Sequence, residues 1–250
     1  MGFFLKKSDF CSKILLFSFE LLSCYHQIKQ HSSVMVAAYT FNTQYNPHGM
    51  ERVPSMRLLE GGKFSEGQFA PVLVQEYQQV RLKYFRWGLV PAFTKAGRKP
   101  QPITFAPAEH LFRQPAYQVP IRRQRCLVPA DGFYTTNEQR GHGHQVKLAR
   151  PEGETFCFAG VYDTWRQPDG TLLDTFAVIT VPSNQAVSRF SLQMPLILPS
   201  NVEGTWLSSY TDLNKIQKLL SLPIGTGLRM HPVQELRLPE IAQPSEQVAA

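Results

Sequence analysis

The sequence predicts an α+β fold that is rich in β-strands, and three observations support this class. The chain of 250 residues contains 19 prolines and 16 glycines, which divide it into many short elements. Its composition, 43% hydrophobic and 18% charged, is typical of a globular protein and not of a disordered one. Apolar runs rich in β-branched and aromatic residues alternate with turn signals, which favours β-rich or α+β architecture over a helix bundle.

The expected strands follow from these apolar runs. Residues 68–76 (QFAPVLVQE) form a mostly apolar segment, and residues 81–87 (RLKYFRW) alternate between polar and apolar side chains. Asp169 and Gly170 lie between two long strand-like segments and predict a hairpin turn there. The remaining segments expected to be strands are 125–129, 144–150, 154–165, 173–182 and 193–199, with an edge strand in 227–235.

Three helices are expected. Pro107 at the start of residues 107–113 suits the first turn of a short helix. Ser200 followed by Glu203 predicts a capping box that opens a helix through Leu207. Residues 211–222 predict another helix, capped by Thr211 or Asp212.

The domain boundaries are expected at two changes in the chain. Residues 35–238 contain no clear linker or repeat and are expected to form one domain, followed by a disordered tail at 239–250. Residues 1–34 form an N-terminal extension whose apolar runs are too short to span a bilayer. The extension has three explanations: Met35 is the true start, the extension is a real helix, or it is a signal sequence ending near Cys24.

Charge and cysteine usage limit the class of partner. The formal net charge is +7, and residues 81–125 contain ten basic residues but a single acid, Glu109. Cations interleaved with aromatic rings are typical of single-stranded nucleic acid binding, although a solvated basic face would have the same composition. The four cysteines include no CxxC pair, so we expect no metal site, no cofactor and a reducing cytoplasm. We expect a monomer without a membrane partner.

The stretch RCLVPADGFYTT, from Arg125 to Thr136, resembles a strand that delivers a reactive loop. Cys126 lies in its apolar part and is expected to be a core thiol. Asp131 is expected to satisfy the backbone of the turn and not to do chemistry. Thr135 and Thr136, which follow, are poor proton carriers.

Seven motifs in a fixed order resemble the SRAP family, the SOS-response-associated peptidases, also described as abasic-site processing proteins. These motifs are RWGLVPAF, FAPAEHL, RRQRCLVPADGFY, FAGVYDTW, FAVITVPSN, QMPLILP and TWL. The resemblance covers about residues 35–210 and implies mixed, mainly antiparallel sheets that form a distorted barrel with flanking helices. It also implies a role in the DNA-damage response, in which an N-terminal cysteine, exposed when Met is removed, joins its amine and thiol to the aldehyde of an abasic site.

When the family's motifs are aligned with this sequence position by position, other residues stand at the family's functional positions. Val36 stands at the cysteine, and Ala38 at an arginine near it. Phe105 and Pro107 stand at the Asn and Arg that hold the site and a phosphate. The family's proton carriers, a Glu and a His, are replaced at Thr135 and Ser191, with Thr136 for Trp and Gln193 for Arg beside them.

Three functions are compatible with this pattern. The first is a catalytically impaired SRAP-like protein that keeps weak affinity for single-stranded DNA. The second is an active abasic-site cross-linker with peptidase-like self-processing, and the third is a non-enzymatic protein whose former cleft binds another partner. For the first, the expected DNA contacts are Arg86, Trp87, Phe93, Lys95, Arg98 and Lys99.

Overall fold

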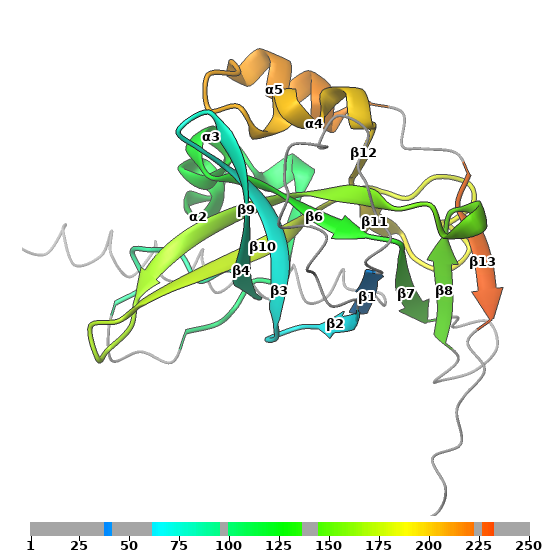
Figure 1. Cartoon of the computed structure of the whole chain (residues 1–250), viewed down its shortest axis with the longest axis horizontal. Coiled ribbons are helices and arrows are strands. Elements are labelled where there is room, and N and C mark those ends of the chain that lie inside the picture. Colours follow the sequence, from blue (N-terminus) through cyan, green and yellow to red (C-terminus); the bar gives the residue numbers. More distant parts are fainter. Residues whose placement is uncertain (1–37, 42–61, 96–99, 137–144, 223–226, 233–250) are drawn as a thin grey trace, which may run out of the picture.

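A closed ring of five strands forms the centre of the fold (Figure 1). The computed structural model describes residues 38–41, 62–95, 100–136, 145–222 and 227–232. Around the ring, each strand pairs with the next, and only the β4–β10 pair is parallel. In ring order these strands are β4 (Gln79–Trp87), β3 (Phe69–Glu76), β6 (Arg125–Ala130), β9 (Phe156–Arg166) and β10 (Leu172–Pro182).

Three short strands extend the ring at its margins. Strands β5 (Phe105–Pro107) and β11 (Gln193–Pro195) both pair with the C-terminal part of β10. Strand β12 (Ile197–Leu198) pairs with the start of β9. The mixed, mainly antiparallel barrel expected from the family resemblance is thereby confirmed.

A second, five-stranded antiparallel sheet lies beside the ring (Figure 1). Its strands, in spatial order, are β13 (Arg229–Pro232), β8 (Gln145–Ala149), β7 (Gly132–Thr136), β1 (Ala38–Phe41) and β2 (Gly62–Ser65). The cross-strand neighbours Tyr39, Phe133 and Leu148 are fully buried, so this face of the sheet joins the core. The edge strand expected in residues 227–235 is confirmed by β13.

The helices gather over the outside of the ring, and Figure 1 shows α4 and α5 side by side above it. Helix α4 (Ser200–Leu207) packs against β6 and β9, while α3 (Pro120–Arg123) contacts the same two strands. The other helical elements are α2 (Pro115–Gln118), α5 (Leu213–Leu220) and the 3₁₀ turns η2 (Ala108–His110) and η4 (Pro151–Gly153).

Local signals were right for one helix cap and wrong for another. Asp212 caps α5 by accepting a hydrogen bond from the backbone NH of Lys215 at 3.0 Å, as one of the two expected caps. The capping box predicted at Ser200 is wrong, because α4 follows Pro199 without a side-chain cap and its Glu203 is buried instead. The helix predicted over 107–113 is reduced to the single turn of η2, since Pro107 belongs to β5.

The hairpin between β9 and β10 forms as predicted. Gly170 has a φ of +88°, which favours glycine, and the Asp169 carboxylate accepts from the backbone NH of Thr171 at 3.0 Å. Inside the ring, a Cβ at Gly160 would lie 2.8 Å from the Cys126 sulfur and 3.2 Å from the Ala177 carbonyl. The ring is therefore closed too tightly at this point for any side chain.

Candidate functional site

The turn after β6 is fixed by a carboxylate that joins three strands. The Asp131 carboxylate accepts a short hydrogen bond from the Thr40 hydroxyl and an ion pair from Lys147, at 3.0 Å. Its backbone NH donates to the Thr40 carbonyl at 2.8 Å. Asp131 was expected to satisfy the backbone of its own turn, and this detail is wrong, because its side chain binds residues of the neighbouring strands β1 and β8. No signal in the sequence identified Lys147 as its partner.

The strand that leads into this turn, β6, lies across one intervening strand from the QMPLILP motif. In β9, Cys157 pairs with Pro129 of β6 on one side and with Leu198 of β12 on the other. Phe158 is flanked in the same way by Val128 and Ile197. The fold thus brings together two motifs that lie about seventy residues apart in the sequence, as a common site requires.

The FAPAE motif reaches the same region from the opposite side of β10. Thr180 pairs with Pro107 of β5 along one edge and with Pro195 of β11 along the other. Thr180 is fully buried, and its hydroxyl has no hydrogen-bond partner among the described residues. At Pro107, where the resemblance predicts an arginine, the proline ring offers this region no donor.

An aromatic cluster lies between β1 and β5. The Tyr39 ring lies 5.3 Å from the ring of Trp87, which lies 5.7 Å from the ring of Phe105. Burial raises the pKa of Tyr39 well above its usual range, and the Cys126 thiol adds to this rise. Phe105, at the family's Asn position, is thus part of an apolar cluster, and Ala38 beside Tyr39 is buried as well.

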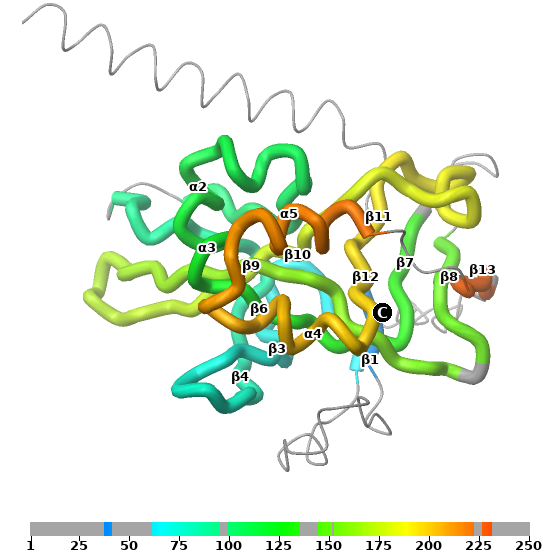
Figure 2. Tube along the Cα trace, turned by 90° about the horizontal axis from the view of Figure 1, so that it is seen from above, coloured from blue at the N-terminus to red at the C-terminus, as the bar shows by residue number. Residues whose placement is uncertain are grey.

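The two hydroxyl residues at the proton-carrier positions are both buried. Thr135 on β7 is 2% exposed and Ser191, just before β11, is 5% exposed. The Ser191 hydroxyl accepts from the backbone NH of Gln193 at 3.3 Å. Figures 1 and 2 both draw the yellow segment between β10 and β11 beside β7. Val36 lies outside the described residues.

Cys126 is a core thiol, as the sequence indicated. It is fully buried, and burial raises its pKa above the usual range of a thiol. Cys157 is also buried, and neither cysteine is part of a disulfide. Within the described ranges, no three His, Cys, Asp or Glu side chains are grouped so that they could hold a metal ion. The described residues also contain no helix that is long and apolar enough to cross a membrane.

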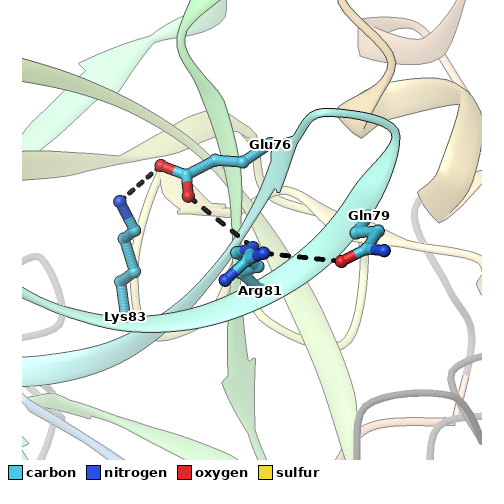
Figure 3. Close-up of polar contacts among 4 residues, drawn as sticks. All are labelled: Glu76, Gln79, Arg81 and Lys83. Carbon is cyan, nitrogen blue, oxygen red and sulfur yellow. Dashed lines mark hydrogen bonds and ion pairs between the residues drawn. The ribbon is translucent and has the colours of Figure 1, made fainter.

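The basic excess of residues 81–125 does not form one continuous exposed surface. Lys83 and Arg81 both approach the carboxylate of Glu76, and Gln79 accepts from Arg81 (Figure 3). Arg125 is 2% exposed and donates to backbone carbonyls of α3 and of the end of α4. Arg113, Arg122 and Arg123 are exposed around the short helices α2 and α3. The charge of this segment is therefore divided among separate places.

The expected DNA contacts differ in their exposure. Trp87 is 1% exposed, and its indole NH donates to the Thr104 carbonyl at 3.0 Å, so its proposed role as a stacking surface is wrong. Phe93 is 62% exposed, and Arg86 and Lys95 are exposed as well. Arg98 and Lys99 lie outside the described residues.

A family model and individual relatives of this chain indicate the same protein family. The family model described as "SOS response associated peptidase (SRAP)" matches residues 19–236, so the match begins within the segment 1–34. The abasic site processing protein YoqW of Bacillus subtilis is 31% identical over 166 residues, which cover 66% of this chain and 74% of that protein. The abasic site processing protein HMCES of Mus musculus is 27% identical over 183 residues, covering 59% of this chain and 50% of that protein.

Solved structures support the fold alone. A crystal structure of a protein from Bordetella bronchiseptica aligns with a TM-score of 0.64 at 17% identity, covering 79% of this chain and 99% of that one. Another, from Bacteroides thetaiotaomicron, aligns with a TM-score of 0.62 at 24% identity, covering 69% of this chain and 78% of that one.

Proposed function

The chain belongs to the SOS response associated peptidase (SRAP) family, and from this premise we propose that it binds single-stranded DNA without forming a stable cross-link to abasic sites. The relatives named as abasic site processing proteins support DNA as the partner. Cys126 and Cys157 are buried and form no disulfide, which is compatible with a reducing compartment such as the cytoplasm.

The main support for the absence of cross-linking chemistry is the packing of Thr135, Ser191 and Phe105, the residues at the family's functional positions. Thr135 and Ser191 are nearly inaccessible, and Phe105 packs its ring against Trp87. A Thr or Ser hydroxyl does not ionise near neutral pH and cannot serve as a general acid or base there. With Val36 in place of cysteine, the chain also lacks a thiol that could trap an imine as a ring. The scaffold is retained while each of these chemical groups is absent.

The retained DNA affinity is proposed to centre on Phe93. The residues on both sides of Phe93 are held by the ring strands: the Ala92 NH donates to Asp163 at 2.8 Å, and the Thr94 carbonyl accepts from the Trp165 indole at 3.0 Å. The ring of Phe93 is nevertheless 62% exposed, so a well-anchored segment presents it to solvent. Such a ring suits base stacking, and the exposed Lys95 lies two residues away for a phosphate contact.

A cross-linking assay tests the absence of stable chemistry. The full chain, and a chain beginning at Met35, are incubated with an oligonucleotide that carries one abasic site and are run on a denaturing gel. We expect no shifted band without borohydride, and at most a trapped imine with it. A shifted band without borohydride would contradict the proposal and identify an active cross-linker.

A gain-of-function variant serves as the control for the scaffold. The chain beginning at Met35 with Val36→Cys, Thr135→Glu and Ser191→His regains the nucleophile and the two proton carriers of the family pattern. We expect it to form more denaturant-resistant adduct than its parent. Circular dichroism must show that the variant is folded, because Thr135 and Ser191 are buried and the larger side chains need space.

A further inference from the structure

The five-stranded sheet presents a row of cations on the side that faces away from the core. Cross-strand partners share one face of a sheet, so the pairings Tyr134–Lys147, Lys147–His231 and Ala149–Arg229 place these side chains together. The pairings Thr40–Lys63 and Thr40–Gly132 add Lys63 at the opposite margin. We call this surface, made of Lys63, Tyr134, Lys147, Arg229 and His231, the cationic face.

The side chains of the cationic face are ordered by their neighbours. The Lys63 ammonium lies 4.3 Å from the centre of the Tyr134 ring, a cation–π contact. The Lys147 ammonium lies 3.0 Å from Asp131, and a Cβ at Gly132 would come within 2.3 Å of the Lys147 side chain. Asp131 is the one acid that these described residues contact, and it is only 7% exposed. The cations, and not the acid, therefore face solvent.

The shape of the cationic face suits an extended polyanion. Its outer members, Lys63 on β2 and Arg229 on β13, are four strands apart, which corresponds to roughly 19 Å at the usual strand spacing. Both residues are exposed, and both belong to the margins of the sheet. Tyr134 is half-buried beneath Lys63, so the surface offers charge but no free ring for base stacking.

The cationic face is also next to the candidate site. Strand β7 carries Thr135 among the buried residues and Tyr134 on the cationic face, one position apart in the chain. Strand β1 does the same with the buried Tyr39 and with Thr40, which contacts Asp131. The two strands that hold the candidate site therefore also support the cationic face.

We propose that the cationic face is a second contact surface for the phosphate backbone of single-stranded DNA, used by nucleotides beyond those at Phe93. The proposal rests on the proposed function, because that function supplies the polyanion. It predicts a contact that depends on charge and strand length but not on sequence.

The length of the DNA oligonucleotide distinguishes a contact at the cationic face from the contact at Phe93. Binding of oligothymidylates of about 6 and about 20 nucleotides is compared, one near the lower end of typical single-strand site sizes and one beyond their upper end. The test variant is Lys63→Gln with Arg229→Gln, and the matched control is Lys215→Gln with Lys218→Gln, which removes two exposed cations from α5. All four positions are exposed, so thermal midpoints should agree with that of the parent.

We expect the parent to bind the long strand more tightly than the short one. In the test variant this gain, the ratio of long-strand to short-strand affinity, should fall about tenfold at low salt. The salt slope, which is the slope of log affinity against log salt concentration, should fall by about 1.4, or 0.7 for each lost phosphate contact. The control variant should keep the parent's gain. An unchanged gain and salt slope in the test variant would overturn the cationic face as a DNA contact. Failure of the parent to bind either strand would overturn the proposed function itself.

Discussion

The side chains of Arg125 and Trp206 each donate a hydrogen bond across the boundary between β6 and α4. The Arg125 guanidinium donates to the Trp206 carbonyl at 2.6 Å, and the Trp206 indole NH donates to the Cys126 carbonyl at 2.9 Å. The same guanidinium donates to the carbonyls of Ile121 and Arg122, both at 2.7 Å. One buried cation thus joins α3 and α4 to the ring, and burial lowers its pKa only to about 10, so it remains charged.

We expect Arg125→Met to destabilise the protein strongly. The substitution leaves several buried carbonyls of α3 and α4 without their charged donor, which should cost about 3 kcal/mol or more. Urea denaturation followed by tryptophan fluorescence measures this change. The control is Arg123→Met, an exposed neighbour for which the change should stay within about 0.5 kcal/mol. Equal effects of the two variants would contradict the structural role of Arg125.

Glu203 should make the protein less stable as pH rises through neutrality. Burial raises the pKa of Glu203 to about 7, while the Cys157 thiol and the charge of Arg150 act against this rise. Because the folded state holds this proton more tightly than the unfolded state, its stabilising effect is complete in acid and is lost as pH rises towards and past 7. The full effect corresponds to roughly 3 kcal/mol if the unfolded pKa is normal.

The Glu203→Gln variant isolates this contribution. A neutral amide has the shape of the protonated carboxyl group, so the variant should match the parent at about pH 4, below the unfolded pKa of Glu203, and exceed its stability at about pH 8. Urea denaturation at the two pH values gives the comparison. If the difference between variant and parent were the same at both, Glu203 would not titrate in this range.

Cys126 should not react with thiol reagents in the folded protein. It is fully buried, and burial raises its pKa, so neither access nor thiolate is available. Iodoacetamide labelling followed by peptide mass spectrometry should find Cys126 modified only after denaturation. Labelling of the native protein at Cys126, at a rate like that of a free thiol, would be inconsistent with this environment.

Phe93→Ala should weaken the binding of short single strands. Loss of one stacking ring costs about 1–3 kcal/mol, which is roughly tenfold or more in affinity. Tyr210→Ala is a suitable control, because Tyr210 is 83% exposed beyond the end of α4 and is not expected to contact DNA. Fluorescence anisotropy with a short oligothymidylate measures both. Similar losses for the two variants would show that Phe93 has no special role.

The ring strands could be predicted from the sequence because they are apolar segments or, in β4, an alternation of polar and apolar residues. Strands β3, β9 and β10 follow runs whose side chains are almost all buried. Strands β1 and β7 were not predicted as strands, since AYTF and GFYTT are short and contain small or polar residues. Their pairing partners are distant in the chain, and single-sequence patterns do not contain that information.

The candidate site shows the same limit at the level of side chains. Trp87 lies among cations in the sequence, but strand alternation places it with the buried Phe85 and opposite to the exposed Tyr84 and Arg86. That alternation was visible and could have excluded it from the DNA contacts. By contrast, the burial of Glu203 under the pattern of a capping box depends on the packing of α4 against β9, which local sequence does not determine.

Ring closure has a consequence for how quickly the chain can fold. The hydrogen bond from the Val90 NH to the Thr175 hydroxyl joins residues 85 positions apart, next to the parallel pairing of β4 with β10. The hairpin of β9 and β10, by contrast, pairs residues that are close in sequence. Closing the large loop costs chain entropy before any contact across it is made. The last step of folding is therefore expected to be the docking of a preformed β9–β10 hairpin onto β4, and the ring becomes continuous only at that moment.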